Sequence, residues 1–167
     1  MALTPLVEGG AQTALLALSV ALIVLRLLCN LFDGMVAVEG GKAGPDGAFW
    51  NEVPDRLADI AILVGAGAAA GALALGWAAA ALAVLVAYVR AVGETLGQPG
   101  DFSGPMAKPH RMGAICAGAL TTSAIPGGVV GIDPLALALW AIVVGAALTF
   151  GRRAWRLQRA LAKPSPE

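Results

Sequence analysis

The chain has 167 residues, of which 58% are hydrophobic and 13% are charged, so its composition lies well outside that of an average soluble domain. Eleven basic residues balance eleven acidic ones, and this neutral balance indicates no nucleic-acid partner. Composition and length together predict one domain over residues 1–167, an all-α, polytopic integral membrane helix bundle in contact with lipids. Cys29 and Cys116 lie in apolar runs, which predicts buried thiols and neither a disulfide nor a metal site.

Five apolar segments are candidate membrane spans. They cover residues 11–28, 57–75, 77–93, 112–130 and 135–150. Residues 60–89 contain no charged side chain, and one straight helix over them would be about 45 Å long, too long for a single crossing. The sequence therefore predicts a turn near Gly76. The first 25 residues contain no Lys or Arg, so we expect the first span to be kept in the mature protein.

The distribution of Lys and Arg predicts the orientation, because these residues accumulate on the cytoplasmic side of membranes. They occur in segments 38–56 and 90–111 and in the tail 151–167, whereas the residues around Gly76 and segment 126–134 contain none. We therefore expect the N-terminus outside and the C-terminus in the cytoplasm, in a bacterial inner membrane. The basic tail 151–167 is expected to be a positive-inside anchor that lies at the headgroups.

Carboxylates and amides gather where the first span ends and the second begins. Asn30 and Asp33 share one helical face. Asn51, Asp55 and Asp59 share another, because residues three or four apart are neighbours on a helix. Ionisable groups at membrane depth are costly unless paired or hydrated, so this cluster predicts a functional site, most simply one for Mg²⁺ or Mn²⁺. The plainer alternative is solvation of helix ends at the interface.

The spacing of these residues resembles a known signature. The chain reads Asn30-x2-Asp33-Gly34-x2-Ala37-Val38-x8-Gly47-x3-Asn51-x3-Asp55. This pattern is similar to Asp-x2-Asp-Gly-x2-Ala-Arg-x8-Gly-x3-Asp-x3-Asp, the signature of the CDP-alcohol phosphatidyltransferase family, with five of eight positions in agreement. The signature region spans residues 30–59, and the resemblance covers most of the chain. Family members usually have six membrane helices, so the first of these is expected to be absent or truncated here.

The resemblance implies a function in phospholipid biosynthesis. It implies transfer of a phosphoalcohol group, here expected to be phosphatidyl, from a CDP-linked lipid donor to the hydroxyl of a small alcohol acceptor, with release of CMP at the cytoplasmic face. By position, Asn30, Asp33 and Asn51 would ligate metal and Asp55 would be the general base, near the metal. The small residues would let the nucleotide approach the backbone, or serve helix packing: Gly34, Ala37 and Gly47. The family also implies a homodimer.

Three departures from the signature change what is expected of the site. Asn30 and Asn51 replace metal-binding acids, and Val38 replaces an arginine. The formal charge of the three metal ligands is therefore reduced, which weakens attraction for two divalent ions. Glu52 and Asp59 are the acids expected to restore that charge, and amide variants of both with unchanged metal dependence would refute this hypothesis.

Basic residues flank the fourth span. Arg90, Lys108, His110 and Arg111 are candidates to bind the phosphate of a donor or acceptor, Arg by paired hydrogen bonds and Lys as a point charge. Ordinary positive-inside charge explains the same residues equally well. A lone histidine is weak evidence for proton transfer, so His110 is the least specific of the four.

Two other functions compete with the transferase. The lost signature residues are consistent with a catalytically inactive family member that acts as a membrane scaffold or as a nucleotide-lipid binding subunit. A small ion or proton carrier would use Asp33, Asp55 and Asp59 as a relay, but these acids cluster at one face and do not line a path. The signature is shared by enzymes with different acceptors, so the sequence does not identify the acceptor alcohol.

Overall fold

The computed structural model describes residues 9–39, 47–125, 128 and 131–162, and their regular secondary structure is helical. In chain order the helices are α1 (Gly9–Glu39), α2 (Gly47–Ala69), α3 (Leu73–Thr95), α4 (Lys108–Ala124) and α5 (Pro134–Leu161). The expected all-α class is confirmed for this part of the chain.

Three helical segments are long and apolar enough to cross a membrane: Thr13–Phe32 in α1, Leu73–Thr95 (α3) and Pro134–Leu161 (α5). Helices α2 and α4 lie where the second and fourth spans were expected. However, α2 carries Glu52, Asp55, Arg56 and Asp59, and α4 has only 17 residues. A membrane protein is thus supported by three helices, while five crossings and their orientation stay predictions.

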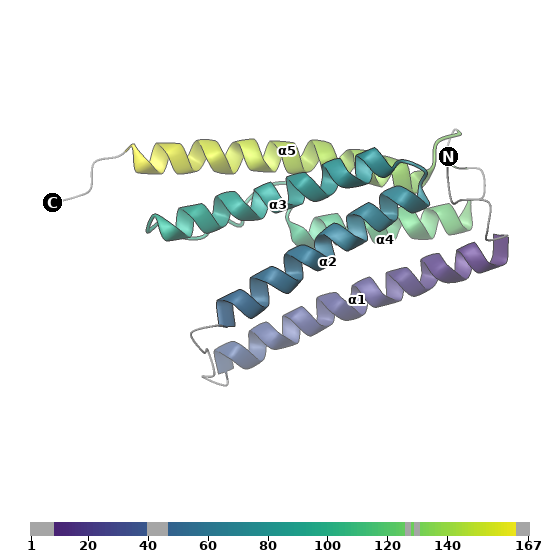
Figure 1. Ribbon diagram of the computed structural model, residues 1–167, viewed down its shortest axis with the longest axis horizontal. Helices are drawn as coiled ribbons and strands as arrows, with labels where there is room; N and C mark the ends of the chain where they lie inside the picture. Colours follow the sequence, from purple (N-terminus) through teal and green to yellow (C-terminus); the bar gives the residue numbers. More distant parts are fainter. Residues whose placement is uncertain (1–8, 40–46, 126–127, 129–130, 163–167) are drawn as a thin grey trace.

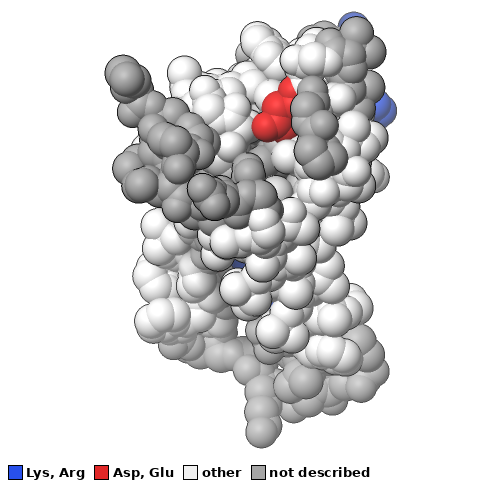
Figure 2. Space-filling model, turned by 90° about the vertical axis from the view of Figure 1, so that its right-hand side faces the viewer, with Lys and Arg blue, Asp and Glu red and all other residues white. Residues whose placement is uncertain are grey.

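The helices run lengthwise side by side (Figure 1). Helix α3 packs on α2 and α5, α4 packs on α5, and α1 lies at the outside of the bundle, mainly against α4. At one end of the bundle α1 and α5 begin and α2 ends, and Figure 2 shows that the described surface there is mostly uncharged, with one patch of acidic atoms and a few basic atoms at its edge. The charged residues of α2 and the basic start of α4 lie away from this end, which agrees with the uneven distribution expected from the sequence.

The turn between α2 and α3 lies at residues 70–72, so its expected position near Gly76 is wrong. Gly71 adopts a φ of 65°, a left-handed conformation that glycine accommodates readily. Gly76 is in the first turn of α3, where a Cβ would lie 2.8 Å from the carbonyl oxygen of Leu63 and 3.0 Å from the Cα of Gly67. The glycines therefore allow α2 and α3 to approach closely, as small residues do between membrane helices.

The core lies between α2, α3, α4 and α5, with little contribution from α1. Its fully buried side chains include Leu63, Ala79, Met112, Leu139 and Ile142. Large apolar residues of α1 are exposed instead, as on a helix that faces lipid: Leu15, Leu18, Leu22, Leu25 and Leu28. Cys29 is also exposed, and Cys116 is half-buried. The expectation of two buried thiols is wrong for Cys29, because an apolar run on α1 is not covered by protein.

The expected tail 151–167 is largely a continuation of α5, which ends at Leu161. Arg153 within it is buried, and it donates hydrogen bonds from Nε to the carbonyl oxygen of Ser103 at 2.9 Å and from Nη1 to that of Val86 at 3.1 Å. Arg153 thus fastens the connection between α3 and α4 to α5, so this residue does not serve as a headgroup anchor.

Candidate functional site

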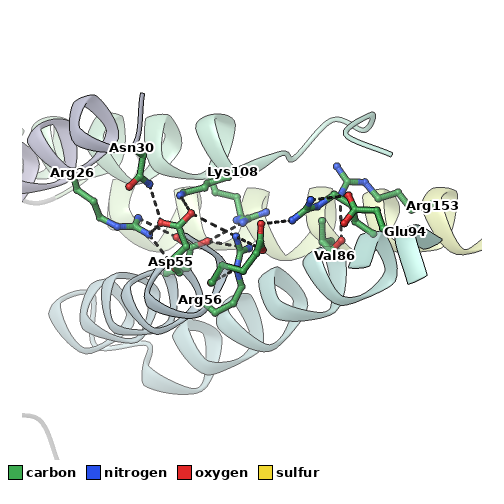
Figure 3. A network of polar contacts seen from close by, with 12 residues as sticks. Arg26, Asn30, Asp55, Arg56, Val86, Glu94, Lys108 and Arg153 are labelled. Atoms are coloured by element: carbon green, nitrogen blue, oxygen red, sulfur yellow. Dashed lines mark hydrogen bonds and ion pairs between the residues drawn. The ribbon is translucent and has the colours of Figure 1, made fainter. Parts of the chain in front are cut away.

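Asp55 lies at the centre of a polar cluster where α1, α2 and α4 meet (Figure 3). Its Oδ1 accepts hydrogen bonds from Arg26 Nη2 at 2.9 Å and from Asn30 Nδ2 at 2.8 Å, and its Oδ2 accepts one from Lys108 Nζ. Burial raises the pKa of Asp55, but the hydrogen bonds from Lys108 and Asn30 and the charges of Lys108 and Arg26 outweigh burial and bring the pKa below its usual range. Asp55 is therefore held as a carboxylate.

Asp59 lies one helical turn beyond Asp55 and is buried. Its Oδ1 accepts a hydrogen bond from Arg26 Nη1 at 3.1 Å, and its Oδ2 accepts one from Arg111 Nη2 at 3.1 Å. Arg111 is itself only 2% exposed and also donates to the carbonyl oxygen of Met106. Among the described atoms, the buried Nε of Arg111 has no hydrogen-bond partner. Asp59 and Arg111 thus form a buried ion pair between α2 and α4.

Glu52 belongs to a neighbouring group of ion pairs that joins α2 to α3. Its Oε1 accepts a hydrogen bond from Arg90 Nη2 at 2.6 Å, and its Oε2 lies 3.4 Å from Arg56 Nη2. Arg90 also pairs with Glu94 at 3.0 Å, and its guanidinium lies 5.0 Å from the centre of the Phe102 ring. Glu52 is therefore directed to Arg90 and does not share a ligand position with Asp55.

Both groups border one cavity of about 440 Å³. The charged residues in its wall are five cations and two acids: Arg56, Arg90, Lys108, Arg111, Arg153, Glu52 and Asp55. This is a formal excess of three positive charges. Clustered Arg and Lys side chains favour phosphate, because they supply charge-assisted hydrogen bonds in a setting with reduced competition from water. The cavity is thus suited to an anionic ligand, with the Asp55 carboxylate at its side.

Three of the four residues expected to bind phosphate line this cavity: Arg90, Lys108 and Arg111. The fourth, His110, is exposed in the first turn of α4 and is not part of the wall. Lys108 is the first residue of α4, which places its side chain beside α2. The fold thus brings the three basic groups together at one place, although Arg111 also serves as the ion-pair partner of Asp59.

The described carboxylates, as they stand, do not fit a divalent cation. Every carboxylate oxygen of Asp55 and Asp59 already contacts an Arg or Lys side chain, and the amide nitrogen of Asn30 donates to Asp55. The described residues contain no group of three His, Cys, Asp or Glu side chains that could hold a metal. The side chains of Asp33 and Asn51 lie outside the described part, so metal ligation by these two stays a prediction.

The residues expected to approach the nucleotide are described only in part. Gly34 and Ala37 belong to α1, but their surroundings lie outside the described residues. Gly47 begins α2, and a Cβ added there would meet no described atom within 4 Å. Packing against the described residues therefore does not require glycine at position 47, and nucleotide binding at these three positions stays a prediction.

Arg26 is central to the site, although the sequence pattern marks it only as an interruption of an apolar span. One signal for it exists in the sequence. Arg26 lies four residues before Asn30 and hence on the same helical face, and a charged residue within an apolar span usually has a partner or a function. Arg153 has no comparable signal, because it lies in a run of basic residues.

Comparison with models of protein families, with curated proteins and with solved structures gave no significant match. The fold and site by themselves define a helical protein of membrane type with a cationic cavity beside a paired carboxylate. The resemblance to CDP-alcohol phosphatidyltransferases depends on the signature residues alone.

Proposed function

We propose that the chain is a CDP-alcohol phosphotransferase of phospholipid biosynthesis. It transfers a phosphatidyl group from a CDP-linked lipid donor to the hydroxyl of a small alcohol and releases CMP. The observation that carries the proposal is the position of Asp55, the last acid of the signature, in the wall of a cavity lined by five cations. A candidate proton acceptor and groups suited to a diphosphate thus lie together.

The proposed chemistry uses the chain's own residues. The acceptor oxygen forms a bond to the donor phosphorus next to the lipid, the bond from that phosphorus to the CMP oxygen breaks, and CMP leaves with the bonding electrons. The hydroxyl proton passes to Asp55 and then to solvent. Arg and Lys side chains of the cavity stabilise the negative charge on the diphosphate.

In the proposed reaction, displacement of the Lys108 ammonium raises the basicity of Asp55. In the structure Lys108 donates to Oδ2 of Asp55 and helps to lower its pKa. A diphosphate in the cavity would attract the Lys108 ammonium away from Oδ2. Loss of that hydrogen bond would raise the pKa of Asp55 and free the oxygen for the acceptor hydroxyl.

The test measures CMP release by the purified full chain in lipid nanodiscs, with CDP-diacylglycerol and a panel of acceptors, in the presence of Mg²⁺ or Mn²⁺. Glycerol phosphate and inositol phosphate sample anionic alcohols, and serine samples a zwitterionic one. We expect release with one acceptor class and a loss of at least about 100-fold in Asp55→Asn. Asp133→Asn is the matched control, because Asp133 is the N-cap of α5 and Asn caps helices equally well.

The inactive-member alternative has one observation in its favour. The oxygens of Asp55 and Asp59 are all engaged by cations of the chain, as in a structural ion-pair cluster. Binding of the CDP-lipid without CMP release in the presence of any acceptor of the panel would support this alternative and refute the transferase. Equal CMP release by the protein and its Asp55→Asn variant would instead refute the role of Asp55.

A further inference from the structure

We propose that Arg26 is a positioning residue that acts as a built-in counter-cation. It occupies the place between Asp55 and Asp59 where a bridging metal ion would otherwise lie, and it thereby holds α1 against α2. This inference does not depend on the transfer reaction, and it explains why the described carboxylates do not fit a divalent cation.

The geometry of Arg26 is that of a bridge. Its Nη1 donates to Oδ1 of Asp59 at 3.1 Å, and its Nη2 donates to Oδ1 of Asp55 at 2.9 Å and to the backbone carbonyl of Asp55 at 3.0 Å. Two carboxylates one helical turn apart repel each other, more so where water is partly excluded. The planar guanidinium can bind both at once, because its donors point in fixed and separate directions.

The other oxygen of each carboxylate faces α4. Lys108 donates to Oδ2 of Asp55, and Arg111 donates to Oδ2 of Asp59. The acid pair on α2 is therefore held from one side by Arg26 of α1 and from the other by two cations of α4. Arg26 is the only one of these three cations that contacts both carboxylates.

Arg26 is important for α1 because this helix has little other attachment to α2. Helix α1 packs mainly on α4, and between α1 and α2 lies a groove of about 460 Å³. Its wall is mostly apolar, with Val20 and Ile23 from α1 and Ile62 and Ala66 from α2, and Arg26 is its charged member. The hydrogen bonds of Arg26 therefore join two helices across a gap that side chains do not fill.

Arg56 provides a matched comparison. It carries the same charge and belongs to the same cluster, but its nitrogens lie 3.7 Å from Asp55 and 4.0 Å from Asp59. It is also on the same helix as both acids, so it joins no second helix to them. If only the net charge of the cluster mattered, removal of either arginine would have the same effect.

The test compares Arg26→Ala, Arg26→Lys and Arg56→Ala in the purified full chain, by thermal unfolding and by Mn²⁺ binding measured with electron paramagnetic resonance. In EDTA we expect Tm to fall by roughly 5 to 10 °C in Arg26→Ala and clearly less in Arg56→Ala. Arg26→Lys should be intermediate, since one ammonium cannot bridge both carboxylates as the guanidinium does.

Recovery of Tm on addition of cations distinguishes a counter-cation role of Arg26 from a role in packing alone. Millimolar Mn²⁺ or methylguanidinium should reverse at least half of the decrease in Tm caused by Arg26→Ala. This variant should also bind one more equivalent of Mn²⁺ than the protein without the substitution. Equal Mn²⁺ stoichiometry, or no rescue by either cation, would overturn the proposal. If Arg26→Ala does not fold in EDTA, recovery of folded protein only when it is prepared with either cation supports the proposal, and failure with both overturns it.

Discussion

Lys108 at the start of α4 donates a hydrogen bond to the carboxylate of Asp55 on α2, a residue 53 positions earlier in the chain. This contact joins the group of basic residues before the fourth expected span to the last acid of the signature. Two segments that the sequence marks separately thus form one site. The contact also helps to lower the pKa of Asp55, which leads to the first prediction.

Stability should decrease at acid pH partly through Asp55. Burial raises its pKa, but Lys108, Asn30 and Arg26 more than compensate, so the folded-state pKa is lower than in the unfolded chain. A group of this kind stabilises the fold fully above its unfolded pKa, and the contribution is lost as pH falls through the lowered folded pKa. We therefore expect Tm to fall below about pH 4, and to fall less steeply in Asp55→Asn. Parallel Tm curves for both proteins would contradict this.

Replacement of Arg111 alone should destabilise the protein strongly. Arg111→Met leaves the buried carboxylate of Asp59 without one of its two hydrogen-bonded cations, and loss of one partner of a buried ion pair typically costs about 3–5 kcal/mol. The double variant Arg111→Met with Asp59→Asn should recover part of this loss, because no unpaired charge then stays buried. Denaturant or thermal unfolding of the variants measures both effects. If the changes in the free energy of unfolding of the two single variants simply add in the double variant, direct pairing of Arg111 and Asp59 is contradicted.

Close approach of α2 and α3 predicts a contrast between two glycines of α2. A Cβ at Gly67 would lie 2.7 Å from the Cα of Gly76, so Gly67→Ala should force the helices apart and cost about 1–3 kcal/mol. A Cβ at Gly65 meets no described atom within 4 Å, so Gly65→Ala should be neutral or slightly stabilising, since alanine favours helix more than glycine. Equal unfolding midpoints for the two variants would contradict the observed packing.

Arg153 should control the order of the connection between α3 and α4. Its guanidinium binds the carbonyl oxygen of Ser103 and that of Val86, and neighbouring Arg156 binds the Ser103 hydroxyl. Arg153→Met should therefore increase hydrogen exchange and protease cleavage at residues 98–105, whereas Arg152→Ala should not, because Arg152 is exposed on α5. Unchanged exchange in Arg153→Met would show that other contacts hold this connection.

The helical class, the apolar segments and the places where charges gather could all be predicted from the sequence. These properties depend on residues that are near one another in the chain: the apolar content of each run, and spacings of three or four that put Asp55 and Asp59 on one face. The position of the α2–α3 turn could not be predicted from the sequence, because residues 60–89 are uniformly apolar and mark no boundary. In the structure the turn lies at residues 70–72, where Gly71 has a positive φ, and Gly76 packs against Gly67 instead.

The pairing of the charged residues could not be predicted from the sequence, because it depends on how the helices pack. Arg26 bridges Asp55 and Asp59, Arg111 binds Asp59 as well as lining the cavity, and Arg153 is buried although it lies in a basic run. Pairings of this kind join residues 29 to 67 positions apart, and they form when helix packing brings the side chains within hydrogen-bond distance. Local pattern shows that a charge is present, but desolvation by neighbouring helices selects its partner.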